Sequence, residues 1–600
     1  MGTFRPHTFH IPVMGLCYTI DSPIKVARFG ISSVISIIED QLIEDIREYY
    51  SNKENEKFVA IPVTEPDSRA KRITAYMNFI NRIVARQMEK LKAESFSPET
   101  DLTKYFEMLP NGSSLGNEYE SMLQESEPSQ KQNLQTQLKN KLVAGSIDVN
   151  IMSKVDKNNY SENGDMLPPE FSDAIAALRG FANSDLNASV VFSAGYNPRL
   201  YAAIENHPDF FPDENGNLKK RVILKVSDFR SALIQGKILA KKGVWISEFR
   251  IESGLNCGGH AFATEGLLLG PILEEFKLKK EDIIKELFTL CQQTLTEKGK
   301  PGLSDSPEMR ITVQGGIGTA AENQFLMDYY HLDGTGWGSP FLLVPEATTV
   351  DSVTLNELAT AKQEDFYLSH ASPLGIRFNN FRKSSAHVQM ETRIEKNRPG
   401  SPCYLKFLSA NTEFTDKPIC TGSRQYQKAK LEQLEEAGAS AREMEKVVEK
   451  DCLCHGLSAS ALLSYDIPVP HKLGAVTICP GPNLAYFSGV HSLKEMVDHI
   501  YGRISLLNSL RRPNLFVNEA VLYVDYLKGE LAESLGEMTK KKSQYLESFK
   551  NNLQSGLDYY GRLIPELKLE SEHYLAQMRE DISRLEKALK AILIPEPVAV

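Results

Sequence analysis

The sequence lacks the features that mark secreted and membrane proteins. Its 600 residues hold only eight cysteines, at irregular spacing, which does not indicate a disulfide framework and makes the reducing cytoplasm the default location. The longest apolar runs, such as residues 190–193 and 267–270, are far too short to cross a bilayer. The first residues hold no long apolar run followed by a small-residue cleavage site. We therefore expect a cytoplasmic protein without a membrane span.

Basic charge is not in excess either. Lysine and arginine number 68 against 78 aspartate and glutamate residues, for a formal net charge of −10. Nucleic-acid binding usually needs a basic surface, so this balance does not favour nucleic acid as a partner. It is ordinary for a soluble protein.

What the sequence does contain is an alternation of strands and helices. Residues 8–38 have the pattern strand, loop, helix, strand, which is one step of a parallel sheet. The alternation returns at residue 188 and includes short apolar runs that end in glycines at 309–317 and 334–337. Hydrophobic residues make up 42% of the chain, enough for at least one large core. The pattern predicts a parallel α/β architecture.

Three other regions differ from this pattern in amino-acid composition. Residues 65–185 are polar and rich in Gln, Glu, Asn, Ser and Lys, which predicts a helical insertion with a mobile segment at 110–135. Residues 386–515 form a cysteine-containing accessory region. Residues 516–600, the tail, show helical periodicity interrupted at Pro565, which predicts two or three long helices. We interpret the tail as a cap or a contact for a homo-oligomer.

Glycine-marked segments follow several predicted strands. The first ends at Met14-Gly15, the second contains Gly258-Gly259 before His260, and the third joins residues 314–318 to 334–341. In a barrel such positions lie at the C-terminal face, where ligands bind and where loops after strands seven and eight hold phosphate. Each segment alone also fits an ordinary turn or, for the histidine, a structural hydrogen bond.

A dinucleotide fingerprint is not supported. Gly316-x-Gly318-x-x-Ala321 has the spacing of one. No acidic ribose partner ends a second strand, however, and the following strand brings another glycine loop. The glycines therefore indicate a mononucleotide-sized phosphate site rather than a Rossmann domain.

Taken together, the motifs resemble the nitronate monooxygenase and FMN-dependent enoyl-ACP reductase superfamily. Residues 10–36 resemble its opening, 252–260 its loop ending Gly-Gly-His, 313–320 and 336–347 its two phosphate loops, and 372–381 its closing segment. The resemblance covers about residues 8–60 and 188–385. It implies an FMN-binding (β/α)₈ TIM barrel in residues 1–64 and 186–385. Enoyl reductases of polyunsaturated fatty acid synthases are similarly larger than the minimal barrel.

The resemblance also implies a role for each matching residue. His260 would be the catalytic acid or base, beside the flavin and the substrate. The implied flavin-binding residues are Met14, Gly15 and Gln314 near the ring or ribityl chain, Lys225 near ring atom N1, Gly258 and Gly259 along the flavin, and Gly315, Gly316, Gly338 and Ser339 at the phosphate. One departure stands out: where the family usually carries Gly-Thr-Arg, this chain has Gly338-Ser339-Pro340, which keeps a hydroxyl but loses a charge.

Four cysteines form a separate group. Cys420 and Cys479 lie in Gly/Pro-flanked turns, and Cys452 and Cys454 are separated by one residue. Four thiolates suit tetrahedral zinc or an iron–sulfur cluster, which makes these residues candidate metal ligands. Scattered, reduced, buried cysteines are the alternative interpretation, because the spacing matches no standard signature.

The leading hypothesis is an FMN-dependent oxidoreductase acting on a small-molecule or acyl substrate. It would either oxidise an activated carbon acid with oxygen or reduce an enoyl double bond, with NAD(P)H binding transiently as the donor. A second hypothesis is a flavin- or phosphate-ligand-binding barrel that mainly assembles partners. A third is a non-flavin barrel that binds a phosphorylated metabolite.

Overall fold

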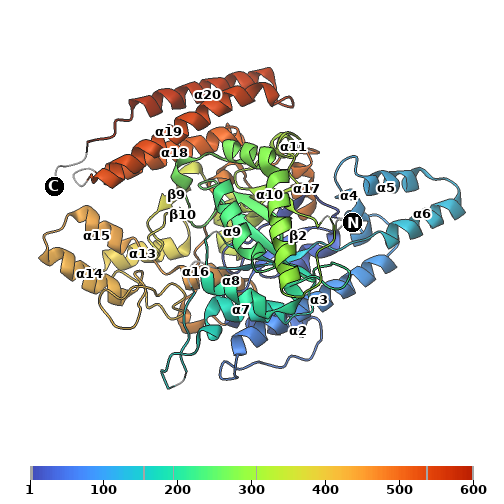
Figure 1. Ribbon diagram of the computed structural model, residues 1–600, viewed down its shortest axis with the longest axis horizontal. Coiled ribbons are helices and arrows are strands. Elements are labelled where there is room, and N and C mark those ends of the chain that lie inside the picture. Colours follow the sequence, from blue (N-terminus) through green and yellow to red (C-terminus); the bar gives the residue numbers. More distant parts are fainter. Residues whose placement is uncertain are drawn as a thin grey trace.

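Eight parallel strands close into a barrel at the centre of the molecule (Figure 1). The structure is a computed structural model that describes residues 5–152, 156–161, 163–193, 195–305, 307–534 and 538–596. The strands pair in chain order, and β8 returns to β1. Their bounds are β1 Phe9–Ile11, β2 Ser32–Ser36, β3 Ile147–Ile151, β4 Ala188–Phe192, β5 Lys220–Val226, β6 Ile246–Glu252, β7 Arg310–Gln314 and β8 Gly334–Gly336. The predicted (β/α)₈ barrel is confirmed.

Charged side chains fill part of the barrel interior. Alternate residues of a strand point to the same side, and here the inward ones form ion pairs. Arg250 lies 2.8 Å from Glu248 and 3.4 Å from Asp148, and Arg310 lies 2.8 Å from Glu248. All four are buried. Removing one partner of such a set costs about 3–5 kcal/mol, so these pairs fix the strands relative to one another.

Strand β3 corrects the sequence-based domain boundaries. It lies inside residues 65–185, which we predicted to be an insertion outside the barrel. Asp148 and Asn150 alternate with three buried aliphatic residues along it. Because Asp148 faces the charged interior and pairs with Arg250, β3 has no continuous apolar run to identify it. Only part of residues 65–185 departs from the barrel.

Helices surround the barrel and extend from it. Those following the strands are α1 Ser22–Val26, α2 Asp40–Lys53, α3 Ser68–Ala93, α7 Asp173–Ala182, α8 Pro198–Ala203, α9 Phe229–Ala240, α10 Leu269–Glu297, α11 Ala320–Tyr329 and α12 Ser352–Ala359. Two hairpins project from opposite ends of the molecule (Figure 1). One contains α5 Ser114–Gln124 and α6 Pro128–Asn140, preceded by α4 Asp101–Glu107; the other contains α14 Arg424–Glu436 and α15 Ala441–Val448.

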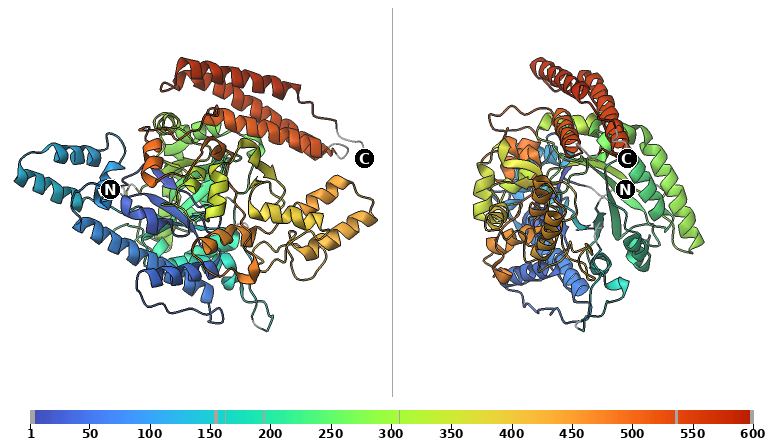
Figure 2. Two further views of the ribbon diagram at one scale, coloured as in Figure 1. Left: turned by 180° about the vertical axis from the view of Figure 1, so that it is seen from behind. Right: turned by 90° about the vertical axis from the view of Figure 1, so that its left-hand side faces the viewer.

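The accessory region and the tail lie against the barrel. An antiparallel pair, β9 Phe366–Ser369 and β10 Phe378–Phe381, is followed by α13 Ser385–Glu395, α16 Leu453–Ser464 and α17 Leu493–Ile500. The tail helices are α18 Leu515–Glu533, α19 Lys540–Leu563 and α20 Glu572–Ala591, which run along one side of the molecule (Figure 2). The predicted long tail helices are confirmed, with a break at Ile564–Glu566 beside Pro565.

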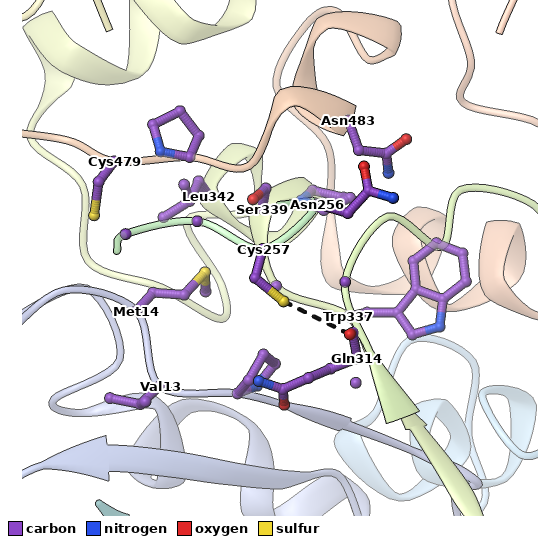
Figure 3. A pocket seen from close by; sticks show the side chains of 18 of the residues that line it. Val13, Met14, Asn256, Cys257, Gln314, Trp337, Ser339, Leu342, Cys479 and Asn483 are labelled. Atoms are coloured by element: carbon purple, nitrogen blue, oxygen red, sulfur yellow. Dashed lines mark hydrogen bonds between the residues drawn. The ribbon is translucent and has the colours of Figure 1, made fainter. Parts of the chain in front are cut away.

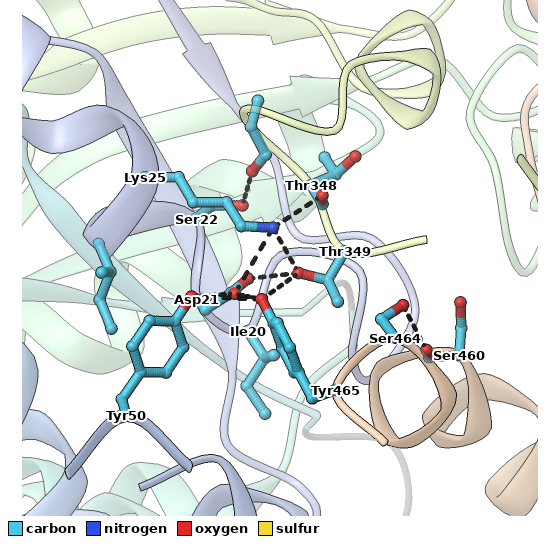
Figure 4. Close-up of polar contacts among 12 residues, drawn as sticks. Ile20, Asp21, Ser22, Lys25, Tyr50, Thr348, Thr349, Ser460, Ser464 and Tyr465 are labelled. Carbon is cyan, nitrogen blue, oxygen red and sulfur yellow. Dashed lines mark hydrogen bonds and ion pairs between the residues drawn. The ribbon is translucent and has the colours of Figure 1, made fainter. Parts of the chain in front are cut away.

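A buried carboxylate joins the accessory region to the barrel (Figure 4). Asp21, in the loop after β1, accepts hydrogen bonds from Tyr50 at 2.7 Å and Thr349 at 2.6 Å. Tyr465, the residue after α16, also donates to it, and Lys25 pairs with it at 3.5 Å. Burial raises the pKa of Asp21, but Lys25 and the three hydroxyls outweigh burial and hold that pKa below its ordinary value. The carboxylate therefore stays charged and holds four segments together.

Within the described ranges, every helix is too short or too polar to cross a bilayer.

Glu519 on α18 attaches the tail to the barrel. Its carboxylate accepts hydrogen bonds from Ser253 Oγ at 2.6 Å, from the Leu269 backbone N–H at 2.8 Å and from the Tyr560 hydroxyl at 3.0 Å. No cation offsets its burial in these contacts, and burial raises the pKa of Glu519 to about 7. Between the pKa that Glu519 has in the unfolded chain and the higher pKa that it has in the folded protein, the carboxylate thus gains a proton on folding.

We predict that Glu519→Gln removes a pH-dependent part of the stability. A carboxyl whose pKa is raised on folding contributes stability that is present below its unfolded value near 4.5 and is lost as pH rises through about 7. As pH rises from 5 to 8, the thermal midpoint of the wild type, followed by circular dichroism, should therefore fall relative to that of the variant. The exposed Asp525→Asn on the same helix is the control. An equal pH dependence for wild type and Glu519→Gln would contradict the assignment.

Candidate functional site

A cavity opens at the C-terminal face of the barrel (Figure 3). It holds about 750 Å³ of empty space including its open mouth. Its walls come from the ends of β1, β6, β7 and β8 and from residues 478–483 of the accessory region. The lining residues are Pro12, Val13, Met14, Gly15, Tyr18, Glu252, Asn256, Cys257, Gly258, Gly259, Gln314, Gly315, Gly316, Ile317, Gly336, Trp337, Gly338, Ser339, Pro340, Leu342, Ile478, Cys479, Pro480 and Asn483.

The loop after β1 forms the floor of this cavity. Met14 and Gly15 both line it, as predicted from the sequence. Gly15 has φ 53°, and a Cβ there would lie 2.8 Å from the ring of Tyr18. Both facts require glycine, because other residues rarely adopt this conformation and the ring leaves no space. The backbone at Gly15 therefore lines the cavity without a side chain.

The loops after β8 and β7 come next around the barrel, because β8 pairs with β1 and β7 pairs with β8. Gly315 and Gly316 have φ of 108° and 80°, conformations that favour glycine. Gly338 and Ser339 follow β8, and Ser339 begins the short helix η6 Ser339–Leu343. Apart from Lys225, all the residues that we predicted to bind the cofactor line the one cavity.

A row of polar side chains connects neighbouring strands and reaches the cavity at Glu252 and Gln314. Lys225 Nζ lies 3.0 Å from the Glu252 carboxylate, which accepts a hydrogen bond from Gln314 Nε2 at 2.7 Å. Gln314 Oε1 is 3.4 Å from His10 Nε2. Burial raises the pKa of Glu252, but Lys225 and Gln314 outweigh burial and hold that pKa below its ordinary value. Lys225 thus acts on the cavity through Glu252 and does not line it.

Residues 478–483 close the cavity from the accessory region. The Cys479 carbonyl accepts a hydrogen bond from the Gly259 N–H at 3.0 Å, and the Gly481 N–H donates to Ser339 Oγ at 2.8 Å. A Cβ at Gly258 would lie 2.3 Å from the Cys479 carbonyl oxygen, so only glycine permits this approach. Sequence reasoning missed this wall, although Cys479-Pro480-Gly481-Pro482 is a conspicuous turn.

Arg512 brings a cation to the loop after β7. Its Nη1 lies 2.7 Å from the Glu322 carboxylate, its Nη2 donates to the Gly316 carbonyl, and its Nε donates to Asn483 Oδ1 at 2.7 Å. Arg512 and Glu322 are both buried. Arg512 therefore joins the loop after β7 to Asn483 of the accessory region, and local sequence held no signal for this contact.

His260 lies at the edge of the site. It follows Gly259 but does not line the cavity. Its Nε2 is 2.7 Å from Ser372 Oγ, and its ring packs edge-on against Phe378 at 5.2 Å between centroids. A backbone bridge to Phe378 attaches it to β10. The catalytic role of His260 stays a prediction.

The predicted set of four metal-binding cysteines is not assembled. Cys479 lines the cavity, because its carbonyl and its turn are held against Gly259. Cys452 and Cys479 both pack against an apolar cluster that contains Cys420 and Cys454, and this cluster also contains Cys403, which the sequence interpretation did not include. In the part of the chain that the structure describes, no three His, Cys, Asp or Glu side chains are arranged to hold a metal ion.

Comparisons with known proteins give structural matches only. No protein-family model and no curated protein matches the chain. A point mutant of FabK from Thermotoga maritima is 12% identical, with a TM-score of 0.28, and the match covers 63% of this chain and 80% of the FabK chain. The enoyl reductase domain of MlnA from the macrolactin biosynthesis cluster of Bacillus amyloliquefaciens is 12% identical, with a TM-score of 0.30 and coverage of 72% and 87%.

A third match is the nitroalkane oxidase from Streptomyces ansochromogenes, which is 9% identical. Its TM-score is 0.28, and the match covers 62% of this chain and 84% of that one. At these TM-scores we take no activity and no site residue from the three structures.

We predict that Lys225→Met destabilises the protein through Glu252. The substitution leaves a largely buried carboxylate without its cation, which costs about 1–3 kcal/mol. The double variant Lys225→Met/Glu252→Gln removes both charges and should recover most of that loss. Urea unfolding followed by circular dichroism measures all three proteins. A double variant as unstable as Lys225→Met would show that the loss of stability does not come from the unpaired charge of Glu252.

Proposed function

We propose that the chain binds FMN in this cavity and acts as an FMN-dependent oxidoreductase of the nitronate monooxygenase or enoyl reductase type. One observation carries the proposal. Segments that follow four strands, far apart in the sequence, bring the residues implied by the motif resemblance, except Lys225 and His260, to one cavity at the C-terminal face of the barrel. Catalytic and cofactor sites of such barrels lie at this face.

The phosphate end of FMN fits the two glycine loops. Within the described residues, no hydrogen bond uses the backbone N–H groups of Gly316, Gly338 or Ser339, all three of which line the cavity. Clustered backbone N–H groups are a common anion site. Because Ser339 Oγ already accepts a hydrogen bond from Gly481, its own proton is available for a phosphate oxygen.

The ring end would lie along the loops after β1 and β6. Met14 and Gly15 offer backbone at the floor, and a Cβ built at Gly259 would have no atom within 4 Å. Leu342 and Trp337 supply apolar walls. Bound FMN would supply hydride and single-electron transfer through its ring, chemistry that amino-acid side chains do not provide.

The chain's own residues would orient and protect this ring. The Glu252 carboxylate, paired with Lys225, accepts a hydrogen bond from Gln314 Nε2 and so gives this amide one orientation in the cavity. Residues 478–483 cover the phosphate end and exclude water. Ser372 orients His260, which would hold or move a proton for a small-molecule or acyl substrate. NAD(P)H is the proposed transient donor if the reaction is a reduction.

We predict that the purified protein is yellow and releases FMN. The two glycine loops together form a site for one phosphate group, and the chain lacks the fingerprint that would bind the pyrophosphate of a dinucleotide such as FAD. Mass analysis of the released cofactor decides between FMN and FAD. Gly316→Ala should lose most of the flavin, because a Cβ would lie 2.6 Å from Asn256 Nδ2. Gly561→Ala, at an uncrowded position, is the control and should keep it.

Other outcomes of this experiment identify the rival functions. Released FAD, or no flavin after reconstitution, contradicts the proposal. A colourless protein that carries a sugar phosphate indicates a barrel for a phosphorylated metabolite. A yellow protein that turns over no electron donor with any acceptor indicates an assembly scaffold.

We predict that His260→Ala keeps the bound FMN and lowers the rate per bound flavin by roughly 10²–10⁴, the range for losing a general acid or base. Ser372→Ala removes only the partner of the imidazole, so its loss should be smaller and should appear together with a shifted pH profile. Flavin content and turnover are measured on the same preparation. A normal rate per flavin in His260→Ala would exclude this residue from the reaction.

A further inference from the structure

A second cavity lies among the helices that surround the barrel. It opens between α1, α2, α3, α4 and the start of α17, and it holds about 1850 Å³ of empty space including its mouth. No residue lines both this cavity, which we call the lysine groove, and the flavin cavity. The residues that line the lysine groove are Ile24, Lys25, Arg28, Phe29, Tyr50, Lys53, Glu54, Gln87, Lys90, Leu91, Glu94, Asp101, Lys104, Met108, Pro345, Glu346, Tyr465, Ser492, Leu493 and Lys494.

A fixed polar network forms one wall of the lysine groove (Figure 4). Lys25, Tyr50 and Tyr465 line the groove, and all three also hold the buried carboxylate of Asp21. Lys25 further donates a hydrogen bond to Thr349 Oγ1 at 2.6 Å. Because Lys25 and Asp21 neutralise each other, this wall shapes the groove without adding net charge to it.

Ion pairs engage several other charged residues of the groove. In each pair a groove residue meets a residue of opposite charge: Arg28–Asp101 at 2.7 Å, Lys494–Asp498 at 2.8 Å and Glu54–Arg86 at 3.5 Å. The two charges of each pair cancel, so these pairs make the groove neither positive nor negative.

The two remaining carboxylates of the groove each bind the start of a helix. Glu94 accepts a hydrogen bond from the Leu102 N–H, in the first turn of α4, at 2.9 Å. Glu346 accepts one from the N–H of Leu493, the first residue of α17. The N–H groups at the start of a helix favour a negative charge beside them. Both carboxylates therefore already have a structural partner.

Three lysines of the groove are left without such partners. Lys53, Lys90 and Lys104 lie on α2, α3 and α4 and line the same groove. In the ranges that the structure describes, their ammonium groups form no ion pair and no hydrogen bond. Lys53 faces the ring of Tyr50, with its Nζ 5.5 Å from the ring centroid. Three like charges around one cavity repel one another, and an anion among them would offset that repulsion.

The lysine groove also has an apolar part. Ile24, Leu91 and Met108 are buried residues that line it. Ligand sites commonly combine apolar walls with a few polar or charged groups that fix the orientation of the ligand. A bare inorganic anion would leave the apolar wall without a contact, so the groove suits a molecule with both an anionic and an apolar part.

We propose that the lysine groove binds a small molecule that carries two or more phosphate charges and an apolar part, the chemistry of a nucleoside diphosphate. Lysine ammonium groups are common ligands of phosphate. A concave site whose free cations come from three helices suits a small molecule rather than a flat protein surface. The site lies outside the flavin cavity and does not depend on FMN binding.

Calorimetric titration of the full-length protein with ADP, in the presence of excess FMN, tests the proposal. We expect one site per chain, with an affinity that falls as NaCl rises from about 50 to 300 mM, because salt screens the lysine charges. Lys90→Gln should weaken binding about threefold, and the triple variant of Lys53, Lys90 and Lys104 to Gln about twentyfold. Lys92→Gln, at an exposed lysine of the same helix outside the groove, is the matched control and should bind as the wild type does.

Two further measurements locate the site and identify its occupant. Gly316→Ala, which disrupts the proposed phosphate site for FMN, should still bind ADP as the wild type does. Inorganic pyrophosphate should bind more weakly than ADP, because it does not contact the apolar wall. Circular dichroism should show that the lysine variants stay folded, since these side chains form no ion pair.

Three results would overturn the proposal. The first is no saturable binding of ADP up to about 10 mM. The second is ADP binding that survives in the triple lysine variant but is lost in Gly316→Ala, which would place the nucleotide in the flavin cavity. The third is pyrophosphate binding as tight as that of ADP, which would contradict the apolar part of the assignment. None of these results bears on whether the protein binds FMN, which the released cofactor decides separately.

Discussion

The buried guanidinium of Arg512 is the constraint on which the site depends. It bonds at once to Glu322 at the start of α11, to the carbonyl of Gly316 and to Asn483. Leaving one member of such a pair alone in the interior costs about 3–5 kcal/mol, so the three segments are held in a fixed relation. The loop after β7 and residues 478–483 therefore belong to one site, although one comes from the barrel and the other from the accessory region.

The interior of the barrel and its C-terminal face have different roles: the interior fixes the strands, and the face is open to a ligand. Ion pairs among Asp148, Glu248, Arg250 and Arg310 fill part of its interior and fix the strands. At the C-terminal face, glycines replace side chains and leave backbone exposed to a cavity. Between these layers, the Lys225–Glu252–Gln314 row carries polar groups up to the cavity floor. A ligand at this face meets preorganised backbone and amide groups, which need little rearrangement on binding.

Sequence reasoning found what local patterns encode. The loops at Gly15, Gly259, Gly316 and Gly338 were recognisable because glycines directly follow apolar runs, and they do converge on one cavity. The long tail helices were visible from their periodicity. Strand β3 was missed because its inward Asp148 serves an ion pair with a strand about a hundred residues away. No local pattern reports such a partner.

The same limit applies to the residues that complete the site. Asn483 and Arg512 acquire their roles only through contacts with the loop after β7. The turn at Cys479 has a visible signal, but its cysteine was assigned only to a metal-binding group, whereas it lines the cavity and packs against a cluster that also contains Cys403. Which cysteines meet is a property of the tertiary arrangement, and four residues in one sequence region do not determine it.

The central claim is that one cavity, built jointly by the barrel and the accessory region, holds the flavin. A crystal structure of the protein reconstituted with FMN tests it most directly. The account predicts phosphate oxygens within about 2.7–3.2 Å of the N–H groups of Gly316, Gly338 and Ser339, with the ring over Met14–Gly15. A flavin bound elsewhere, or a phosphate turned away from these loops, would contradict it.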